Sequence, residues 1–178
     1  MVLFLRPGPK ESILSTDATI DIIEANLDLT IHSQAVLELL NAYAGDPMGN
    51  GSPLPPDVLK TLIPGLQQHP GTIIFIAFRK NKPVGVVTCF RGFSTFMAKP
   101  LLNISDFYVL PDFRGSGAGK RLLGAVEKKA VSMGCCKITL EVQENNATAI
   151  AVYTGTGFNR DVHTPEAGPA LFFSKSLA

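Results

Sequence analysis

The chain has 178 residues, of which 46% are hydrophobic and 17% charged, and its formal net charge at pH 7 is +1. This length and composition predict one globular domain with its own hydrophobic core. The balance of 16 basic against 15 acidic side chains argues against a nucleic-acid partner, because nucleic-acid binders usually carry a basic excess.

Residues 1–18 contain several Pro, Gly, Ser and Thr and predict a loose leader ahead of a single domain over 19–178. The apolar run within MVLFLRPGPK is shorter than the roughly 7–15 residues of a secretory signal core. No stretch approaches the roughly 18 apolar residues of a membrane span. We therefore expect a cytoplasmic protein without a membrane partner.

The N-terminal part of the domain combines a strand with two helices. The run TIDIIEA (19–25) predicts a strand, and apolar residues at helical spacing predict a helix over 33–44. The turn-rich segment GDPMGNGSPLPP follows. A second helix starts over 57–63, and Pro64 with Gly65 should kink or break it before Gln67.

The middle of the chain is rich in strands. The runs TIIFIAFR (72–79) and PVGVVTCF (83–90) are separated by a short polar link, which predicts a hairpin. The segment RGFSTFMAKP (91–100) follows, and LLNISDFYVL (101–110) predicts a third strand.

The C-terminal part predicts two helices and two strands. Behind a glycine-rich loop, a helical apolar stripe begins at Leu122 and ends at Gly134. Alternating residues over 136–142 predict a strand with one buried face, a short helix runs over 146–153, and FFSKSL (172–177) supplies a last strand. The element order is that of a mixed α/β fold.

The cysteines and histidines predict no metal site. Cys89, Cys135 and Cys136 form neither a disulfide framework nor a metal-ligand spacing. The three histidines are far apart in the sequence and belong to no ligand motif.

The loop VLPDFRGSGAGK (109–120) carries three glycines at alternate positions. The phosphate-loop pattern of nucleotide hydrolases fails, because arginines occupy 114 and 121. The dinucleotide pattern G-x-G-x-x-G fails because its last glycine would fall on Lys120 or Leu122. Ser116 does not fit the hydrolase elbow G-x-S-x-G, because that pattern needs a glycine at 114. A simple turn would need fewer glycines.

The remaining pattern is R-x-x-G-x-G, formed by Arg114, Gly117 and Gly119 between a strand and a helix. It resembles the acyl-coenzyme-A-binding motif of the GCN5-related N-acetyltransferase (GNAT) family. The segment NATAIAVYTGTGF resembles the family's second motif, N-x-x-A-x-x-x-Y-x-x-x-G-F, at the usual distance. The resemblance covers most of the chain beyond residue 18 and is weakest over 44–70.

The resemblance implies an acyl-CoA N-acyltransferase fold of the α/β type. Such a fold has a central, mostly antiparallel sheet with a splayed parallel strand pair, flanked by about four helices. It also implies an enzyme that uses acetyl-CoA as acyl donor, whose pyrophosphate suits the unpaired N–H groups of a helix N-terminus. The donor-binding residues that it implies are Phe107, Tyr108, Val109, Arg114, Gly115, Ser116, Gly117, Ala118, Gly119, Lys120, Asn146 and Tyr153.

The resemblance also implies roles in catalysis. An amine would attack the thioester directly, the backbone near Val109 would stabilise the oxyanion, and Tyr153 would protonate the leaving thiolate. Tyr153 could instead be a core tyrosine packed beside Phe158. For the general base the family suggests a carboxylate on the strand before the loop, acting alone or through water. Asp106 is the only carboxylate on that strand, and Glu141 on the neighbouring strand is the other candidate.

The segment from 93 to 115 is also similar to the diamine and thialysine acetyltransferase branch, but one acid of that branch's usual pair is replaced by Ser105. We expect the loops 46–56 and 91–100 to line the acceptor site. Within the second loop, Phe93, Phe96 and Met97 are either core residues or an apolar wall for the acceptor.

A small-molecule amine is the expected acceptor. A protein N-terminus or lysine is one alternative, and a catalytically silent acyl-CoA sensor is another. Because members of the family often dimerise, a homodimer is compatible with the resemblance.

Overall fold

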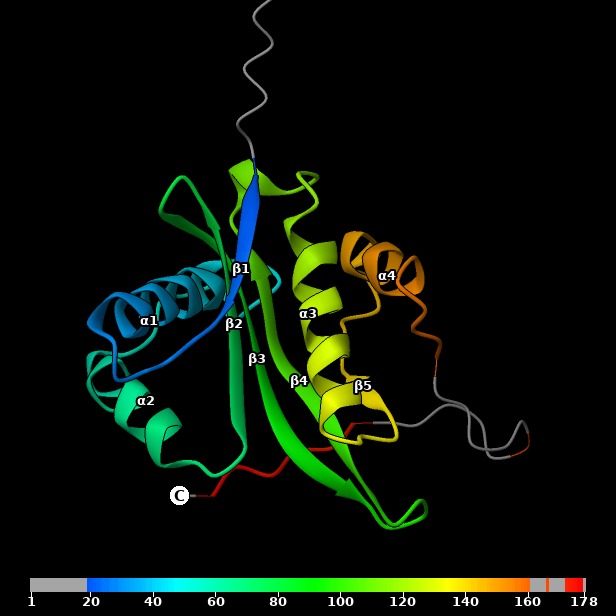
Figure 1. Cartoon of the computed structure of the whole chain (residues 1–178). Helices are drawn as coiled ribbons and strands as arrows, with labels where there is room; N and C mark the ends of the chain where they lie inside the picture. The colour runs from blue at the N-terminus through cyan, green and yellow to red at the C-terminus, as the bar shows by residue number, and fades with distance from the viewer. Residues whose placement is uncertain (1–18, 161–165, 167–171, 178) are drawn as a thin grey trace, which may run out of the picture.

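The computed structural model describes residues 19–160, 166 and 172–177, so the expected leader over 1–18 lies outside the described residues. The described part holds five strands, four α-helices and one short 3-10 helix (Figure 1). In chain order they are β1 (Ile20–Glu24), α1 (Thr30–Gly45), α2 (Pro56–Gln68), β2 (Thr72–Arg79), β3 (Lys82–Ser94), β4 (Lys99–Val109), η1 (Pro111–Phe113), α3 (Ala118–Ser132), β5 (Ile138–Leu140) and α4 (Ala147–Thr154).

The strands form one sheet in the order β1-β2-β3-β4-β5. Neighbouring strands are antiparallel except β4 and β5, which pair in parallel over 102–104 and 138–140. Helix α3 covers one face of the sheet, whereas α1 and α2 cover the other (Figure 1). The expected mixed sheet, with mostly antiparallel strands and a parallel pair, is confirmed.

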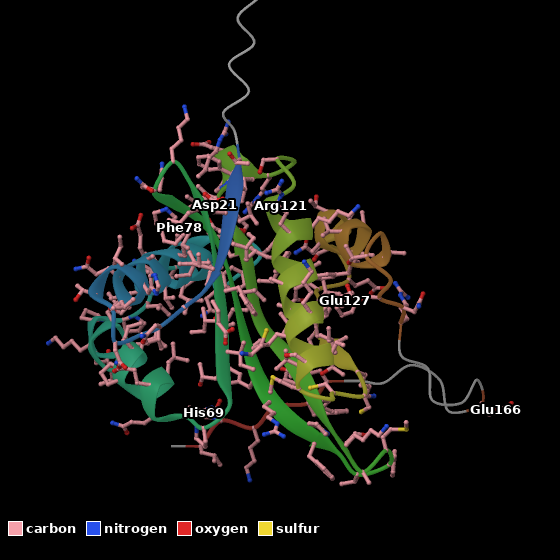
Figure 2. All side chains as sticks on the ribbon, viewed as in Figure 1. Asp21, His69, Phe78, Arg121, Glu127 and Glu166 are labelled. Atoms are coloured by element: carbon pink, nitrogen blue, oxygen red, sulfur yellow. The ribbon has the colours of Figure 1, made fainter. Side chains whose placement is uncertain are left out.

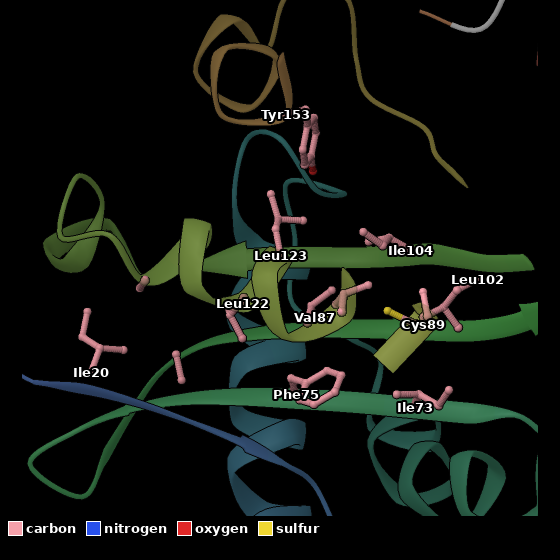
Figure 3. Close-up of a cluster of buried hydrophobic side chains, with 14 of the residues drawn as sticks. Ile20, Ile73, Phe75, Val87, Cys89, Leu102, Ile104, Leu122, Leu123 and Tyr153 are labelled. Carbon is pink, nitrogen blue, oxygen red and sulfur yellow. The ribbon is translucent and has the colours of Figure 1, made fainter. Parts of the chain in front are cut away.

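Two hydrophobic cores hold these layers together. On the α3 face, Leu122, Leu123 and Val126 pack with the strand residues Val87 and Leu102 (Figure 3). All five are at least 97% buried. Burying a side chain of this size contributes about 1.5–3 kcal/mol, so the apolar stripe of α3 fixes the helix on the sheet.

The second core lies between the sheet and the pair α1 and α2. It contains Val36 and Leu39 of α1 together with Ile76 and Val86 of the central strands, all with no exposed surface. Tyr108 of β4 belongs to this core, so the end of β4 contacts α1 directly.

A β-bulge in β4 directs its last residues. Thr88 of β3 pairs with Asp106, whereas the next residue, Cys89, pairs with Ile104, which leaves Ser105 without a partner. One extra residue reverses the alternation of side chains. As a result both Ile104 and Phe107 join the α3-face core.

Beyond Ile104, β4 and β5 no longer pair. The outer backbone edge of residues 105–109 is therefore free of a neighbouring strand. This divergence is the splay that the resemblance implied, and it opens the sheet beside the glycine loop.

Among the expectations for the C-terminal and helical segments, one strand is absent, one strand is shorter than expected, and one expected helix break does not occur. Residues 172–177 form no strand, because no neighbouring strand pairs with them; strand propensity alone does not stabilise a strand. The strand expected over 136–142 is limited to Ile138–Leu140. Helix α2 continues through Pro64 without a break, and the buried Leu66 holds its last turn against the core.

The segment 91–100 is not a loop along its whole length. The ladder between β3 and β4 extends to the pair Ser94 and Lys99, so only the tip of a long hairpin is irregular. In Figure 1 this tip points away from the glycine loop at the other end of the sheet.

Candidate active site

A cavity of about 1030 Å³ lies where β4 and β5 diverge. Its walls include Phe107 and Tyr153 from the α3 face and Tyr43 and Tyr108 from the α1 face. Figure 3 shows Tyr153 extending from α4 toward β4. The cavity therefore reaches both faces of the sheet at the splay.

The glycine loop forms one end of this cavity. Gly115 and Gly117 have φ of 77° and 88°, values that side-chain-bearing residues rarely adopt. Nothing lies within 4 Å of a Cβ built at either position, so backbone conformation, not crowding, requires glycine there. Gly119 differs, because its Cβ would lie 3.2 Å from the Phe107 ring. This glycine allows α3 to approach β4 closely.

The N-terminus of α3 can hold an anion. The Arg121 N–H donates to the Gly117 carbonyl at 3.1 Å, so the N–H groups of residues 118–120 precede the first hydrogen bond of the helix. Such groups lie at the positive end of the helix dipole. Lys120 also lines the cavity and adds a positive charge.

Arg114 of the loop and Arg121 of α3 are both engaged with other parts of the protein. Arg114 Nη2 lies 2.5 Å from Asp46 Oδ2, and Arg114 Nε donates to the Val109 carbonyl at 3.1 Å. Arg121 donates to the Ile20 carbonyl at 2.6 Å and lies beside β1 (Figure 2). Arg114 thus joins the end of α1 to the end of β4, and Arg121 stabilises the edge strand.

Asp46 is a charged anchor at the end of α1. Its Oδ1 accepts the Met48 N–H at 2.9 Å. Burial alone would raise the pKa of Asp46, but the hydrogen bonds from Met48 and Arg114 and the Arg114 charge outweigh burial and lower this pKa. The carboxylate is therefore ionised and engaged at neutral pH.

Tyr153 is a buried phenol between two aromatic rings. Its ring centroid lies 5.5 Å from that of Phe107 and 5.8 Å from that of Phe158. Burial raises the pKa of Tyr153, and the nearby Tyr43 adds to this rise. The phenol therefore keeps its proton at neutral pH and can donate it to an anion in the cavity.

The two candidate bases occupy different places. Asp106 lies opposite Thr88 in the ladder and is not part of the cavity wall. Burial raises the pKa of Asp106, and the Thr88 hydroxyl offsets part of the rise. Glu141 follows β5, is exposed and lines the cavity.

Most of the residues expected at the site line this one cavity. Ser116 does not, because its hydroxyl donates to the Phe113 carbonyl at 2.6 Å, and Ala118 is buried under the loop. Asn146 caps α4 by accepting the Ala149 N–H at 3.1 Å. The expected residues that line the cavity are Phe107, Tyr108, Val109, Arg114, Gly115, Gly117, Gly119, Lys120, Glu141, Asn146 and Tyr153.

Of the two loops expected at the acceptor site, one lines the cavity and the other does not. The loop 46–56 contributes Asp46 and Met48 to the cavity wall, whereas the segment 91–100 contributes nothing to it. Phe93, Phe96 and Met97 are 62%, 92% and 58% exposed, so they are neither core residues nor a wall of this cavity. Continued strand pairing carries them to the far end of the hairpin.

Tyr43 belongs to the apolar residues at helical spacing that predicted a helix over 33–44, and its place in the cavity wall was not predicted from the sequence. The available signal was its position one turn before the predicted loop. Phe113, Gln143 and Asn145 also line the cavity and carried no motif signal.

Among the helices of the described chain, none has both the length and the apolar character that a membrane crossing requires. Within the same residues, no three His, Cys, Asp or Glu side chains gather where they could hold a metal ion.

Comparisons with known proteins identify the family. The model of the acetyltransferase (GNAT) family matches residues 35–158. The uncharacterized N-acetyltransferase YhfO of Bacillus subtilis is 30% identical over 96 residues, which are 54% of this chain and 64% of that protein. The match therefore spans less than two thirds of this curated relative.

Solved structures show the same fold. An aminoglycoside acetyltransferase from an uncultured soil metagenomic sample, in complex with sisomicin, superposes with a TM-score of 0.72 at 18% identity over 89% of this chain and 97% of that chain. The aminoglycoside N-acetyltransferase AAC(6')-Iy in complex with CoA gives a TM-score of 0.69 at 19% identity over 89% and 95% of the two chains. With the family model matched from residue 35 to residue 158, the chain belongs to the acetyltransferase (GNAT) family, a family of acyltransferases.

Proposed function

We propose that the chain transfers the acetyl group of acetyl-CoA to a primary amine of a small molecule. The observation that carries this proposal is that one cavity contains both a glycine-built helix N-terminus and the buried phenol of Tyr153. The first suits a pyrophosphate, and the second suits protonation of a thiolate. Similarity to structures of aminoglycoside acetyltransferases supports a small-molecule acceptor.

The residues present fit coenzyme A. The N–H groups of residues 118–120 and the Lys120 ammonium would hold the pyrophosphate, and the left-handed Gly115 and Gly117 keep side chains away from it. The free edge of β4 over 105–109 would bind the pantetheine amides as an added strand binds a sheet.

The backbone of Val109 is directed toward the reaction. Leu110 N–H donates to the Val84 carbonyl at 2.9 Å, so alternation turns the polar groups of Val109 toward the free edge. The Val109 carbonyl there accepts Arg114 Nε, which leaves the Val109 N–H to stabilise an oxyanion.

The reaction is a direct acyl transfer. The unprotonated amine nitrogen attacks the thioester carbonyl carbon, a C–N bond forms, and the C–S bond breaks. Tyr153 donates its proton to the leaving thiolate, and a base takes the proton that the amine loses. The products are the N-acetylated amine and CoA.

Glu141 is the base that the geometry favours, directly or through a water molecule, because it lines the cavity and Asp106 does not. Glu141→Gln should lower kcat/KM by about 10²-fold or more, whereas Asp106→Asn should leave it within about threefold of wild type. The opposite result would assign the base to Asp106.

The reaction would occur within one domain over 19–178. The cysteines Cys89, Cys135 and Cys136 are all free, as suits the reducing cytoplasm. Fractionation of cells that produce the protein checks the location, and finding it outside the cytoplasmic fraction would contradict this part of the proposal.

Thermal unfolding with acetyl-CoA, CoA, ATP and NAD added separately tests donor binding. Ligand at about 100 times its dissociation constant stabilises by roughly 2.7 kcal/mol, which raises the melting temperature by about 5–10 °C in a domain of this size. Acetyl-CoA and CoA should give this shift, and ATP and NAD should not. Absence of a shift with both CoA forms, in folded protein free of carried-over ligand, would refute the proposal.

A further inference from the structure

We infer that the acceptor is a monoamine with an apolar body, and that polycationic amines are poor substrates. This inference rests on the proposed acetyl transfer and concerns the part of the cavity beyond the reaction site, on the α1 face of the sheet.

The wall on the α1 face is aromatic and apolar. The rings of Tyr43 and Tyr108 lie 5.5 Å apart, and Met48 at the start of the following loop continues the wall. Surfaces of this kind gain free energy by covering hydrocarbon, at about 25 cal/mol per Å². They offer no full negative charge to a second ammonium.

The carboxylates near this wall are either engaged in an ion pair or outside the cavity wall. Asp46 is 8% exposed and bonded to Arg114. Asp106 is not part of the cavity wall. Among the described residues that line the cavity, Glu141 is the one carboxylate without an ion pair. This single carboxylate can interact with one amine group of the acceptor and leaves none for a second.

The ion pair of Arg114 and Asp46 adds no net charge that would attract a second ammonium. The Arg114 guanidinium lies 5.7 Å from the centre of the Tyr108 ring and is itself bonded to the Asp46 carboxylate, so the pair is neutral as a whole. Burying a charge without a partner is costly, whereas a methyl group at the same position is favoured.

Two amines of equal length separate these effects. Hexylamine and 1,6-diaminohexane carry the same reacting group and differ at the far end, where one has a methyl group and the other an ammonium. With acetyl-CoA as donor, kcat/KM for hexylamine should exceed that for 1,6-diaminohexane at least about tenfold.

A pair of variants tests whether the α1-face wall sets this ratio. Met48 is 37% exposed in a loop, so Met48→Glu can add a second carboxylate without disturbing the core. This variant should shift the ratio toward 1,6-diaminohexane by about tenfold. Met48→Gln has nearly the same size without the charge, so it reports the loss of apolar surface alone and should shift the ratio clearly less than Met48→Glu does.

The outcomes distinguish this inference from the proposed function. Equal or better turnover of 1,6-diaminohexane, or an unchanged ratio in Met48→Glu, would overturn the monoamine assignment. So would a complete lack of turnover of both amines while acetyl-CoA still raises the melting temperature, because donor binding would then be intact. Loss of the acetyl-CoA shift itself would instead refute the proposed function.

Discussion

The two ends of the cavity are built in different ways. The end at α3 consists largely of backbone: two left-handed glycines, the first N–H groups of a helix and the free edge of β4. The end at α1 consists of side chains that are distant in the sequence, because Asp46 and Arg114 are 68 residues apart. A site made of backbone groups suits a donor that is always the same molecule. A site made of side chains can differ in its residues according to the acceptor.

Arg114 connects these two ends. It bonds the carboxylate of Asp46 and the carbonyl of Val109. Its motif position is next to the glycines, but its side chain supports the α1 end. Substitutions at each end should therefore affect donor binding, turnover and stability separately.

The largest expected effect is on turnover, at the phenol between the two ends. Tyr153→Phe should lower kcat by about 10²-fold or more, since it removes the acid but keeps the packing against Phe107 and Phe158. Steady-state kinetics and acetyl-CoA titration check it. Donor affinity should stay unchanged, and unaltered kcat would contradict the acid role. A silent acyl-CoA sensor would instead bind acetyl-CoA and show no turnover in either protein.

The next effect concerns donor binding at the α3 end. Gly117→Ala forces a side chain into φ of 88°, so acetyl-CoA affinity should fall about tenfold as the loop changes conformation. Calorimetric titration measures it. Gly124→Ala is the matched control: it lies within α3 with open space around its Cβ, and it should stabilise by up to about 1 kcal/mol without changing affinity. Equal affinities in both variants would contradict a phosphate-binding role for the loop.

The sequence predicted the α3 end well and the α1 end poorly, for physical reasons. Left-handed turns and a helix N-terminus require particular residues at fixed spacing, so Gly115, Gly117 and Gly119 are visible as a pattern. Local periodicity likewise predicted β2, whose bounds Thr72–Arg79 match the expected run.

The α1 end depends on contacts that local sequence does not encode. The position of Tyr43 one turn before the predicted loop is the one local signal, and it does not distinguish a residue that faces a cavity from one that faces the core. The bulge at Ser105, which decides that Asp106 lies opposite Thr88 and outside the cavity wall, depends on how β3 and β4 pair. The strand expected over 172–177 failed for the same reason, since a strand needs a partner.

A smaller effect, on stability, concerns the ion pair. Asp46→Asn should lower the free energy of unfolding by about 1 kcal/mol at neutral pH, because a charged hydrogen bond to Arg114 becomes neutral. The folded pKa of Asp46 is lowered, so this stability is present above the unfolded pKa of about 3.9 and is lost as pH falls through the folded pKa.

Urea unfolding of wild type and Asp46→Asn between pH 7 and pH 2 follows this difference. The difference in the free energy of unfolding between the two proteins should disappear at the acidic end of this range. Glu38→Gln, on the exposed surface of α1, should show no measurable gap at any pH. A gap for Asp46→Asn that persists at low pH would show that the charge of Asp46 is not its cause.

The smallest expected effect lies at the hairpin tip, away from both ends of the cavity. Phe96 is 92% exposed and does not line the cavity, so Phe96→Ser should change the free energy of unfolding by less than about 0.5 kcal/mol. It should also leave the KM for the amine unchanged, whereas Tyr43→Ser in the α1-face wall should raise that KM. Steady-state kinetics on both variants measure these KM values. A raised KM in Phe96→Ser would show that the hairpin contributes to the acceptor site.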